Sequence, residues 1–181
     1  MLAYVFWHRA APLIERADFE SALARFHAAL AEHPPPGFHG SAAFRVAERT
    51  PWVPGFGPAY EDWYLVEDWV ALGTLNEAAV AGPRHAPHDA VAGESLAGAG
   101  GVYRLTAGAA TPHARHARWL AKLTEVSRED FDAALLATGA SVWMRQMVLG
   151  PAPEYVVRGP DPIELRYPSA PGDLEPVTPS S

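Results

Sequence analysis

Residues 16–23 read RADFESAL and residues 128–135 read REDFDAAL, so the chain carries one DFxxAL pattern twice, at positions far apart in the sequence. Each copy follows a short apolar run and leads into a strand-like segment. Downstream of the first copy the apolar side chains continue at helical spacing, as Phe19, Leu23, Phe26 and Leu30. The two copies therefore predict a duplicated β-α-β unit.

The first copy predicts the element order β-α-β-β-α-β. Its expected strands span residues 2–8, 38–47, 60–66 and 101–105. A helix capped by Asp18 ends at the proline run 34–36, because proline cannot continue the hydrogen-bond ladder. A second helix opens at Asp68, and a short helix begins at Pro87 and ends at the glycines of 98–101.

The second copy predicts a partial β-α-β-β repeat. Its expected strands span residues 117–126, 141–149 and 154–158. Ser127 and Asp130 resemble a capping box that opens the helix between the first two of these strands. We therefore expect a complete unit over 1–110, a partial unit over 111–160 packed on it, and an extended or disordered C-terminal tail over 161–181, which is rich in Pro, Ser and Gly.

This element order, with the repeated DFxxAL pattern, resembles the ferredoxin-like dimeric α/β-barrel superfamily over residues 2 to 158. That group includes antibiotic-biosynthesis-type monooxygenases, muconolactone isomerases, stress-responsive barrel proteins and haem-binding relatives of chlorite dismutase and dye-decolourising peroxidase. The resemblance implies an α+β fold in which the sheets of two modules face one another and enclose a ligand pocket. It also implies a homodimer.

Composition excludes several classes of function. With 14 Lys and Arg against 21 Asp and Glu, the chain has a formal net charge of −7, which argues against a nucleic-acid partner. It has no cysteine, so thiolate catalysis and cysteine-ligated metals are excluded. No stretch approaches the roughly 20 apolar residues that span a bilayer. We expect a cytoplasmic protein without a membrane partner, a metal or a cofactor.

A histidine pair in the segment RHAPHD offers one candidate site. His85 and His88 have a spacing that suits metal ligands, with Asp89 as a third. Pro87 biases Ala86 away from helical geometry, so the two imidazoles are not expected to share a helix face. The other functional interpretation is that Asp89 orients His88 as a general base. The alternative is a loop followed by an ordinary helix N-terminus.

Polar side chains inside the aromatic strands offer a second candidate site. These side chains are His8, Arg45, Glu61, Asp62 and Arg145. Each costs free energy if it is buried without a partner, so it faces water at a strand end or faces a pocket. If several converge with the indoles of Trp63 and Trp143, they form an aromatic cavity with oriented polar groups. Arg45, Trp63, Trp143 and Arg145 are therefore candidate ligand-binding residues, and His8 is a candidate base.

Three functions follow as hypotheses. The first is a cofactor-independent enzyme, a monooxygenase or isomerase of small apolar or aromatic compounds, in which His8 or His88 removes a proton. The second is a non-catalytic ligand-binding or dimerisation module. The third, implied by the resemblance, is haem binding through one histidine.

Overall fold

The computed structural model describes residues 1–46, 52–53, 58–147 and 150–177. Residues 50–58, whose proline and glycine content predicts a loop, lie mostly outside these ranges. The first half of the chain folds as β1 (Leu2–Ala10), α1 (Arg16–Glu32), β2 (Phe38–Val46), β3 (Ala59–Val66), α2 (Trp69–Ala79), the short 3-10 helix η1 (Gly82–Arg84), α3 (His85–Glu94) and β4 (Ser95–Ala107). The second half folds as β5 (His116–Leu120), α4 (Arg128–Leu136), β6 (Ser141–Gln146), β7 (Tyr155–Gly159) and β8 (Ala170–Pro176).

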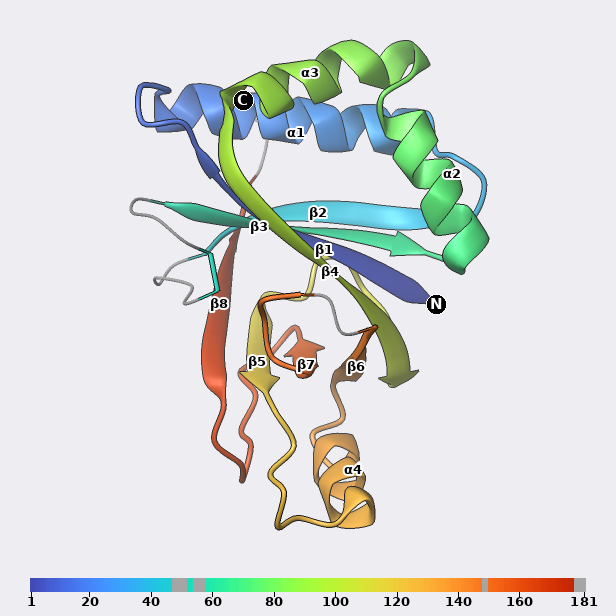
Figure 1. The fold of residues 1–181 in the computed structure, drawn as a ribbon, viewed down its shortest axis with the longest axis vertical. Coiled ribbons are helices and arrows are strands. Elements are labelled where there is room, and N and C mark those ends of the chain that lie inside the picture. Colours follow the sequence, from blue (N-terminus) through green and yellow to red (C-terminus); the bar gives the residue numbers. More distant parts are fainter. Residues whose placement is uncertain (47–51, 54–57, 148–149, 178–181) are drawn as a thin grey trace.

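The eight strands form one closed antiparallel barrel in the order β1-β3-β2-β8-β5-β7-β6-β4 (Figure 1). Each half has the same internal order, with the fourth strand beside the first, the first beside the third, and the third beside the second: β4-β1-β3-β2 and β8-β5-β7-β6. Helices α1 and α4, which carry the two DFxxAL copies, occupy equivalent places in the two halves. The predicted α+β fold, ferredoxin-like and of the dimeric α/β-barrel type, is confirmed.

The barrel closes within a single chain. The two half-sheets meet where β2 pairs with β8 and where β4 pairs with β6. A homodimer is implied where the two facing sheets come from different chains, and here both sheets come from one chain. The homodimer and the domain boundary at residue 110 stay predictions.

The C-terminal segment departs from its sequence prediction. Residues 170–176, expected in an extended or disordered tail, form β8 and complete the barrel between β2 and β5. Pro171 and Pro176 lack a backbone N–H, but they lie near the two ends of this strand, where a missing donor is tolerated. The Pro, Ser and Gly content of this segment is typical of disorder. The segment forms a strand because β2 and β5 offer it two open edges, and the residues of the segment itself do not reveal those edges.

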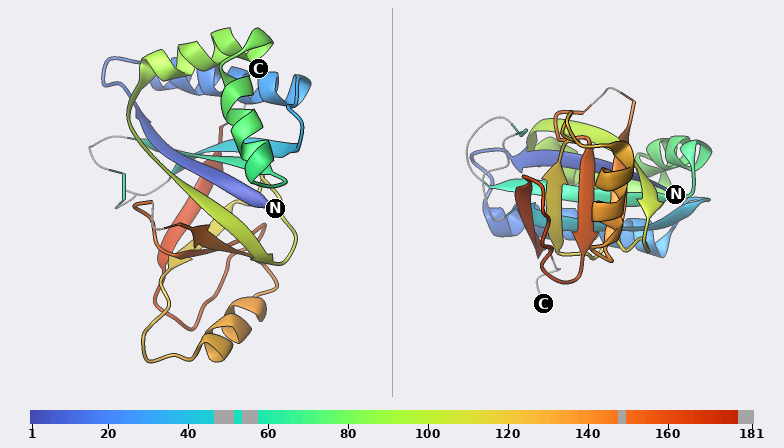
Figure 2. Two further views of the ribbon diagram at one scale, coloured as in Figure 1. Left: turned by 45° about the vertical axis from the view of Figure 1, so that its right-hand side comes forward. Right: turned by 90° about the horizontal axis from the view of Figure 1, so that it is seen from below.

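The barrel separates three apolar cores. Figure 2 shows the ribbon from two further directions. The interior is filled by aromatic and aliphatic side chains, among them Trp7, Trp63, Trp119 and Trp143. Outside the first half-sheet, a second core forms under α1, α2 and α3, and outside the second half-sheet a third core forms under α4. No helix within the described ranges is long and apolar enough to cross a membrane.

The glycine-rich segment 98–101 lies within a strand, although the sequence placed it at the end of a helix. β4 begins at Ser95 and runs through these glycines beside β1. A Cβ on Gly98 would lie 2.5 Å from the ring of Phe6, and one on Gly100 would lie 2.7 Å from the ring of Tyr4. The glycines are therefore the residues that let two aromatic rings of β1 lie flat across β4.

Helix starts follow the predicted chemistry in two cases. The Asp68 carboxylate accepts from the backbone N–H groups of Val70 and Ala71, and the Ser127 hydroxyl accepts from that of Asp130. Helix α1 begins at Arg16, ahead of the predicted cap at Asp18.

Helix α3 likewise begins at His85, ahead of the predicted start at Pro87. Pro87 is tolerated because it falls in the first turn, where a backbone N–H has no partner within the helix. The expectation that Pro87 would keep Ala86 out of the helix is therefore wrong.

Candidate functional site

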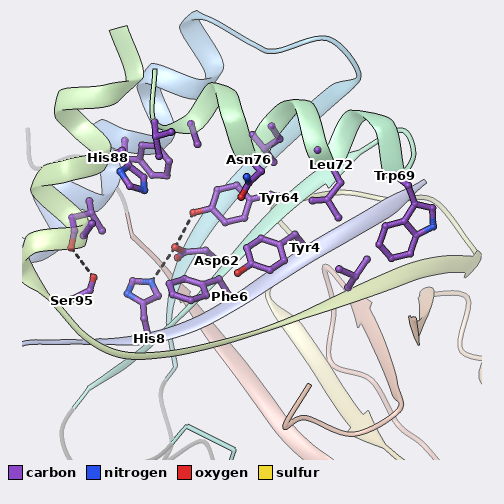
Figure 3. Close-up of a pocket in the computed structure, with 18 residues that line it drawn as sticks. Tyr4, Phe6, His8, Asp62, Tyr64, Trp69, Leu72, Asn76, His88 and Ser95 are labelled. Atoms are coloured by element: carbon purple, nitrogen blue, oxygen red, sulfur yellow. Dashed lines mark hydrogen bonds and ion pairs between the residues drawn. The ribbon is translucent and has the colours of Figure 1, made fainter. Parts of the chain in front are cut away.

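A cavity of about 810 Å³ lies between the outer face of the first half-sheet and the helices above it (Figure 3). Strand alternation explains its floor. Along β1 the side chains of Ala3, Val5 and Trp7 enter the barrel, so those of Tyr4, Phe6 and His8 face the helices. The same alternation along β3 turns Asp62 and Tyr64 toward the cavity. The roof comes from α2 and α3, including Trp69, Leu72, Asn76 and His88.

His8 and Asp62 form a buried pair in the cavity wall. The His8 Nε2 atom lies 3.0 Å from Asp62 Oδ2, and the two residues are 0% and 2% exposed. The same carboxylate oxygen accepts a hydrogen bond of 3.1 Å from the Tyr64 hydroxyl, and His27 Nε2 approaches it to 3.8 Å. His27 in turn pairs through Nδ1 with the Ser41 hydroxyl at 2.7 Å. One buried carboxylate is thus hydrogen-bonded to a histidine and a tyrosine and lies near a second histidine.

The surroundings of Asp62 and Tyr64 determine whether each of these two groups is charged. Burial alone would raise the pKa of Asp62, but the charges of the nearby His8 and His27 side chains, with the hydrogen bond to His8, hold that pKa well below its usual range. Burial and the adjacent Asp62 raise the pKa of the Tyr64 phenol well above its ordinary value. At neutral pH the site therefore contains a carboxylate beside a neutral phenol.

Two polar atoms of the pair have no hydrogen-bond partner among the described residues: His8 Nδ1 and Asp62 Oδ1, both fully buried. An ionised carboxylate can only accept, so the His8 Nε2 atom carries the proton that it donates to Asp62. In the neutral imidazole the lone pair then lies on Nδ1. The aromatic rings of Phe6, Phe19 and Tyr60 surround this imidazole at centroid distances of 5.1, 5.6 and 5.7 Å.

Of the predicted pair His88 and Asp89, only His88 lies in the cavity wall. His88 lines the cavity, and its Nδ1 lies 3.1 Å from Asp89 Oδ1. The Asp89 side chain is 57% exposed and also lies 3.1 Å from His85 Nε2, one helical turn away. Within the described ranges, no group of three or more His, Asp and Glu side chains is arranged to hold a metal ion.

The four predicted ligand-binding residues lie outside this cavity. Trp63 and Trp143 belong to the barrel interior, with their ring centroids 5.6 Å apart. Arg45 donates to Glu20 Oε1 at 3.3 Å and forms an ion pair with Glu175. Arg145 donates to the backbone carbonyl oxygens of Gly150 and Ala152. The polar strand residues therefore divide between two faces of the sheet. His8 and Asp62 meet in the cavity wall, whereas Glu61 lies inside the barrel and accepts from Trp63.

A separate polar group lies inside the barrel. Glu61 accepts from the indole N–H of Trp7 at 2.8 Å and from that of Trp63 at 2.6 Å. The guanidinium of Arg158 lies 3.7 Å from the centroid of the Trp63 ring. Burial raises the pKa of Glu61 and lowers that of Arg158 to about 9. None of these residues lines the cavity.

Tyr64 and His27 were not among the predicted site residues, and Asp62 had no predicted catalytic or binding role. The alternation of residues 60–66 was the available signal, since it places Asp62 and Tyr64 on one face of β3. The approach of His27 from α1 depends on how the helix packs against the sheet, which no local pattern reports.

Comparisons with known proteins give distant structural matches. No protein-family model matches the sequence, and no curated protein matches it significantly. The chain is similar to the crystal structure of a putative chlorite dismutase, with a TM-score of 0.47, 14% identity, and coverage of 98% of this chain and 96% of that one. It is also similar to a mutant chlorite dismutase from Candidatus Nitrospira defluvii, with a TM-score of 0.44, 6% identity, and coverage of 97% and 92%. These scores describe a distant resemblance of fold.

Proposed function

We propose that the cavity binds a small apolar or aromatic compound and that His8, oriented by Asp62, removes a proton from it. The protein would then be a cofactor-independent enzyme of the isomerase or monooxygenase type. The observation that supports this proposal is the buried His8–Asp62 pair, whose Nδ1 atom has no protein partner although it belongs to a residue of the cavity wall.

The geometry suits a general base. Nδ1 of His8 accepts the proton of the bound compound, and the resulting imidazolium donates through Nε2 to the Asp62 carboxylate, which stabilises its positive charge. The charge left on the compound lies beside a largely apolar lining that includes Phe6, Leu72 and Val102. General-base catalysis of this kind contributes roughly 10²–10⁴-fold to a rate.

The two alternatives make different demands. A non-catalytic ligand-binding protein would use the same cavity without proton transfer, so measured turnover separates the two functions.

Haem carries two negatively charged propionates, yet among the described residues none of those that line the cavity is a Lys or Arg that could pair with them. His8 Nε2 is also already bonded to an anionic carboxylate. The lining does not fit haem. A Soret band in protein purified from haem-replete cells would contradict that conclusion.

Deuterium exchange at the acidic α-carbon of 2-tetralone, an uncharged bicyclic ketone, tests the base without knowledge of the natural substrate. We expect the protein to accelerate the exchange followed by NMR in D₂O, and His8→Gln to slow it by about a hundredfold or more. His113→Gln, which removes an exposed histidine outside the cavity, should leave the rate unchanged. An unchanged rate in a folded His8→Gln variant would overturn the assignment of the base.

A pair of glycine substitutions tests the cavity itself. Gly73 lines the cavity on α2, and a Cβ there would meet nothing within 4 Å, so we expect Gly73→Phe to place its ring in the chamber. Gly93 on α3 has equally open surroundings and does not line the cavity. Gly93→Phe is therefore the matched control, since both changes replace a helical glycine with the same side chain. Exchange that survives Gly73→Phe would place the reaction elsewhere.

A further inference from the structure

The chemistry of the cavity wall restricts what the ligand can carry, and this inference rests on the proposed function. Two buried atoms in the wall, His8 Nδ1 and Asp62 Oδ1, lack partners among the described residues. With the proton of His8 on Nε2, both atoms are acceptors. A buried acceptor without a partner costs free energy, so the group that satisfies these atoms must be a donor.

The charges around the cavity favour an uncharged donor. Asp62 is ionised and buried, and the described lining contains neither Lys nor Arg. A carboxylate or phosphate on the ligand would face this like charge without a cation to offset it, at a depth where screening by salt is weak. The remaining polar side chains at this end, Tyr64 and Ser95, already donate to Asp62 Oδ2 and to the Val91 carbonyl.

The rest of the chamber is wide and mainly apolar, with Asn76 and His88 in its roof. Tyr4 and Phe6 lie across Gly100 and Gly98 on the floor. Leu72 and Trp69 continue the wall away from the pair (Figure 3), and Val102 also lines the cavity. A volume of about 810 Å³ exceeds what a single ring fills. The cavity thus has a polar end and an apolar body.

We infer that the ligand is an uncharged compound of fused or linked rings that carries a phenol or enol hydroxyl, which donates to the His8–Asp62 pair. Proton transfer from this hydroxyl breaks its O–H bond and forms an N–H bond at His8 Nδ1, while the electron pair stays on the ligand oxygen. The total charge of the site does not change, because the new imidazolium lies beside the new oxyanion. Ligands that already carry a carboxylate or phosphate at this end are excluded by Asp62.

Three naphthalene probes that differ in one substituent test the inference: 2-naphthol has a donor hydroxyl, 2-methoxynaphthalene has none, and 2-naphthoate has an anion. Titration calorimetry should give the tightest binding for 2-naphthol, with the methyl ether weaker by about tenfold or more, as a hydrogen bond to a charged group implies. 2-Naphthoate should bind most weakly, and Asp62→Asn should narrow the gap between naphthoate and naphthol.

The outcomes separate this inference from the proposed function. If Gly73→Phe abolishes binding of all three probes but naphthoate binds wild-type protein as tightly as naphthol, the cavity is the site and the inference about the ligand is wrong. If Gly73→Phe and Gly93→Phe bind the probes equally, the cavity is not the site and the proposed function fails with it. Failure of all three probes to bind at millimolar concentration would also overturn the inference.

Discussion

Replacement of Asp62 by Asn should destabilise the protein strongly at neutral pH. The buried carboxylate accepts two hydrogen bonds, of 3.0 Å from His8 and 3.1 Å from Tyr64, and lies 3.8 Å from His27. A hydrogen bond to a charged group contributes about 1.5–3 kcal/mol and one to a neutral group about 0.5–1.5 kcal/mol. Both donors share the Oδ2 atom, so the Asn amide oxygen can retain both bonds but not the negative charge. Because two buried hydrogen bonds lose their charged acceptor, we expect the free energy of unfolding to fall by about 2–4 kcal/mol.

The pH dependence of this difference has a definite sign. The pKa of Asp62 in the folded protein lies below the value of 3.8 for an unperturbed aspartate. The folded state therefore binds fewer protons at this group than the unfolded chain, and the stabilisation is fully present above the unfolded pKa. As the pH falls from there through the folded pKa, the stabilisation is lost. The gap between wild type and Asp62→Asn should be constant at pH values above about 5 and should narrow below 3.8.

Urea unfolding followed by tryptophan fluorescence at a series of pH values measures the gap. Asp89→Asn is the matched control, because Asp89 also pairs with two histidines but its side chain is 57% exposed. An exposed pair contributes about 0–1 kcal/mol, so this variant should unfold close to wild type. Equal losses in the two variants, or a gap for Asp62→Asn that widens below pH 3.8, would refute the reasoning.

Two further predictions concern the elements around the site. Asp68→Ala removes the acceptor for the N–H groups of Val70 and Ala71 and should lower the unfolding free energy by about 1 kcal/mol, measured by the same urea titration; no change would mean that the cap contributes nothing. A chain that ends after Tyr167 lacks β8 and leaves β2 and β5 with open edges, so size-exclusion chromatography should detect self-association that the full chain does not show; a monodisperse truncated monomer would contradict this.

The fold was predictable where local chemistry decides it. The DFxxAL echo located equivalent helices in two repeats, and Asp68 and Ser127 marked helix starts correctly. Prediction failed where a partner from another part of the chain decides the structure. The glycines at 98–101 form a strand because rings of β1 lie across them, and residues 170–176 form a strand because β2 and β5 provide open edges.

The candidate site was predictable only in part, for a related reason. His8 and His88 were proposed as bases, and both line the cavity. Asp89 was predicted to be the orienting carboxylate because it is next to His88 in the sequence. The buried carboxylate in the wall is instead that of Asp62. Asp62 lies opposite Phe6 in the pairing of β1 with β3, and this pairing brings it near His8. Trp63 is next to Asp62 in sequence but lies on the other face of the sheet.

The two repeats have diverged in what covers them. The first half-sheet has α1, α2 and α3 above it, with the cavity between them, while the second half-sheet has α4 alone among the described residues, over a core of packed side chains. Duplication of an ancestral unit would have given the outer faces of both half-sheets the same capacity to form a cavity. Among the described residues, the helices between β3 and β4 have no counterpart between β7 and β8. Selection for a new ligand could therefore act on α2 and α3 while the tryptophan-filled barrel and the second repeat keep the chain folded. Such a division of labour makes this helical cover the natural target for redesigning specificity.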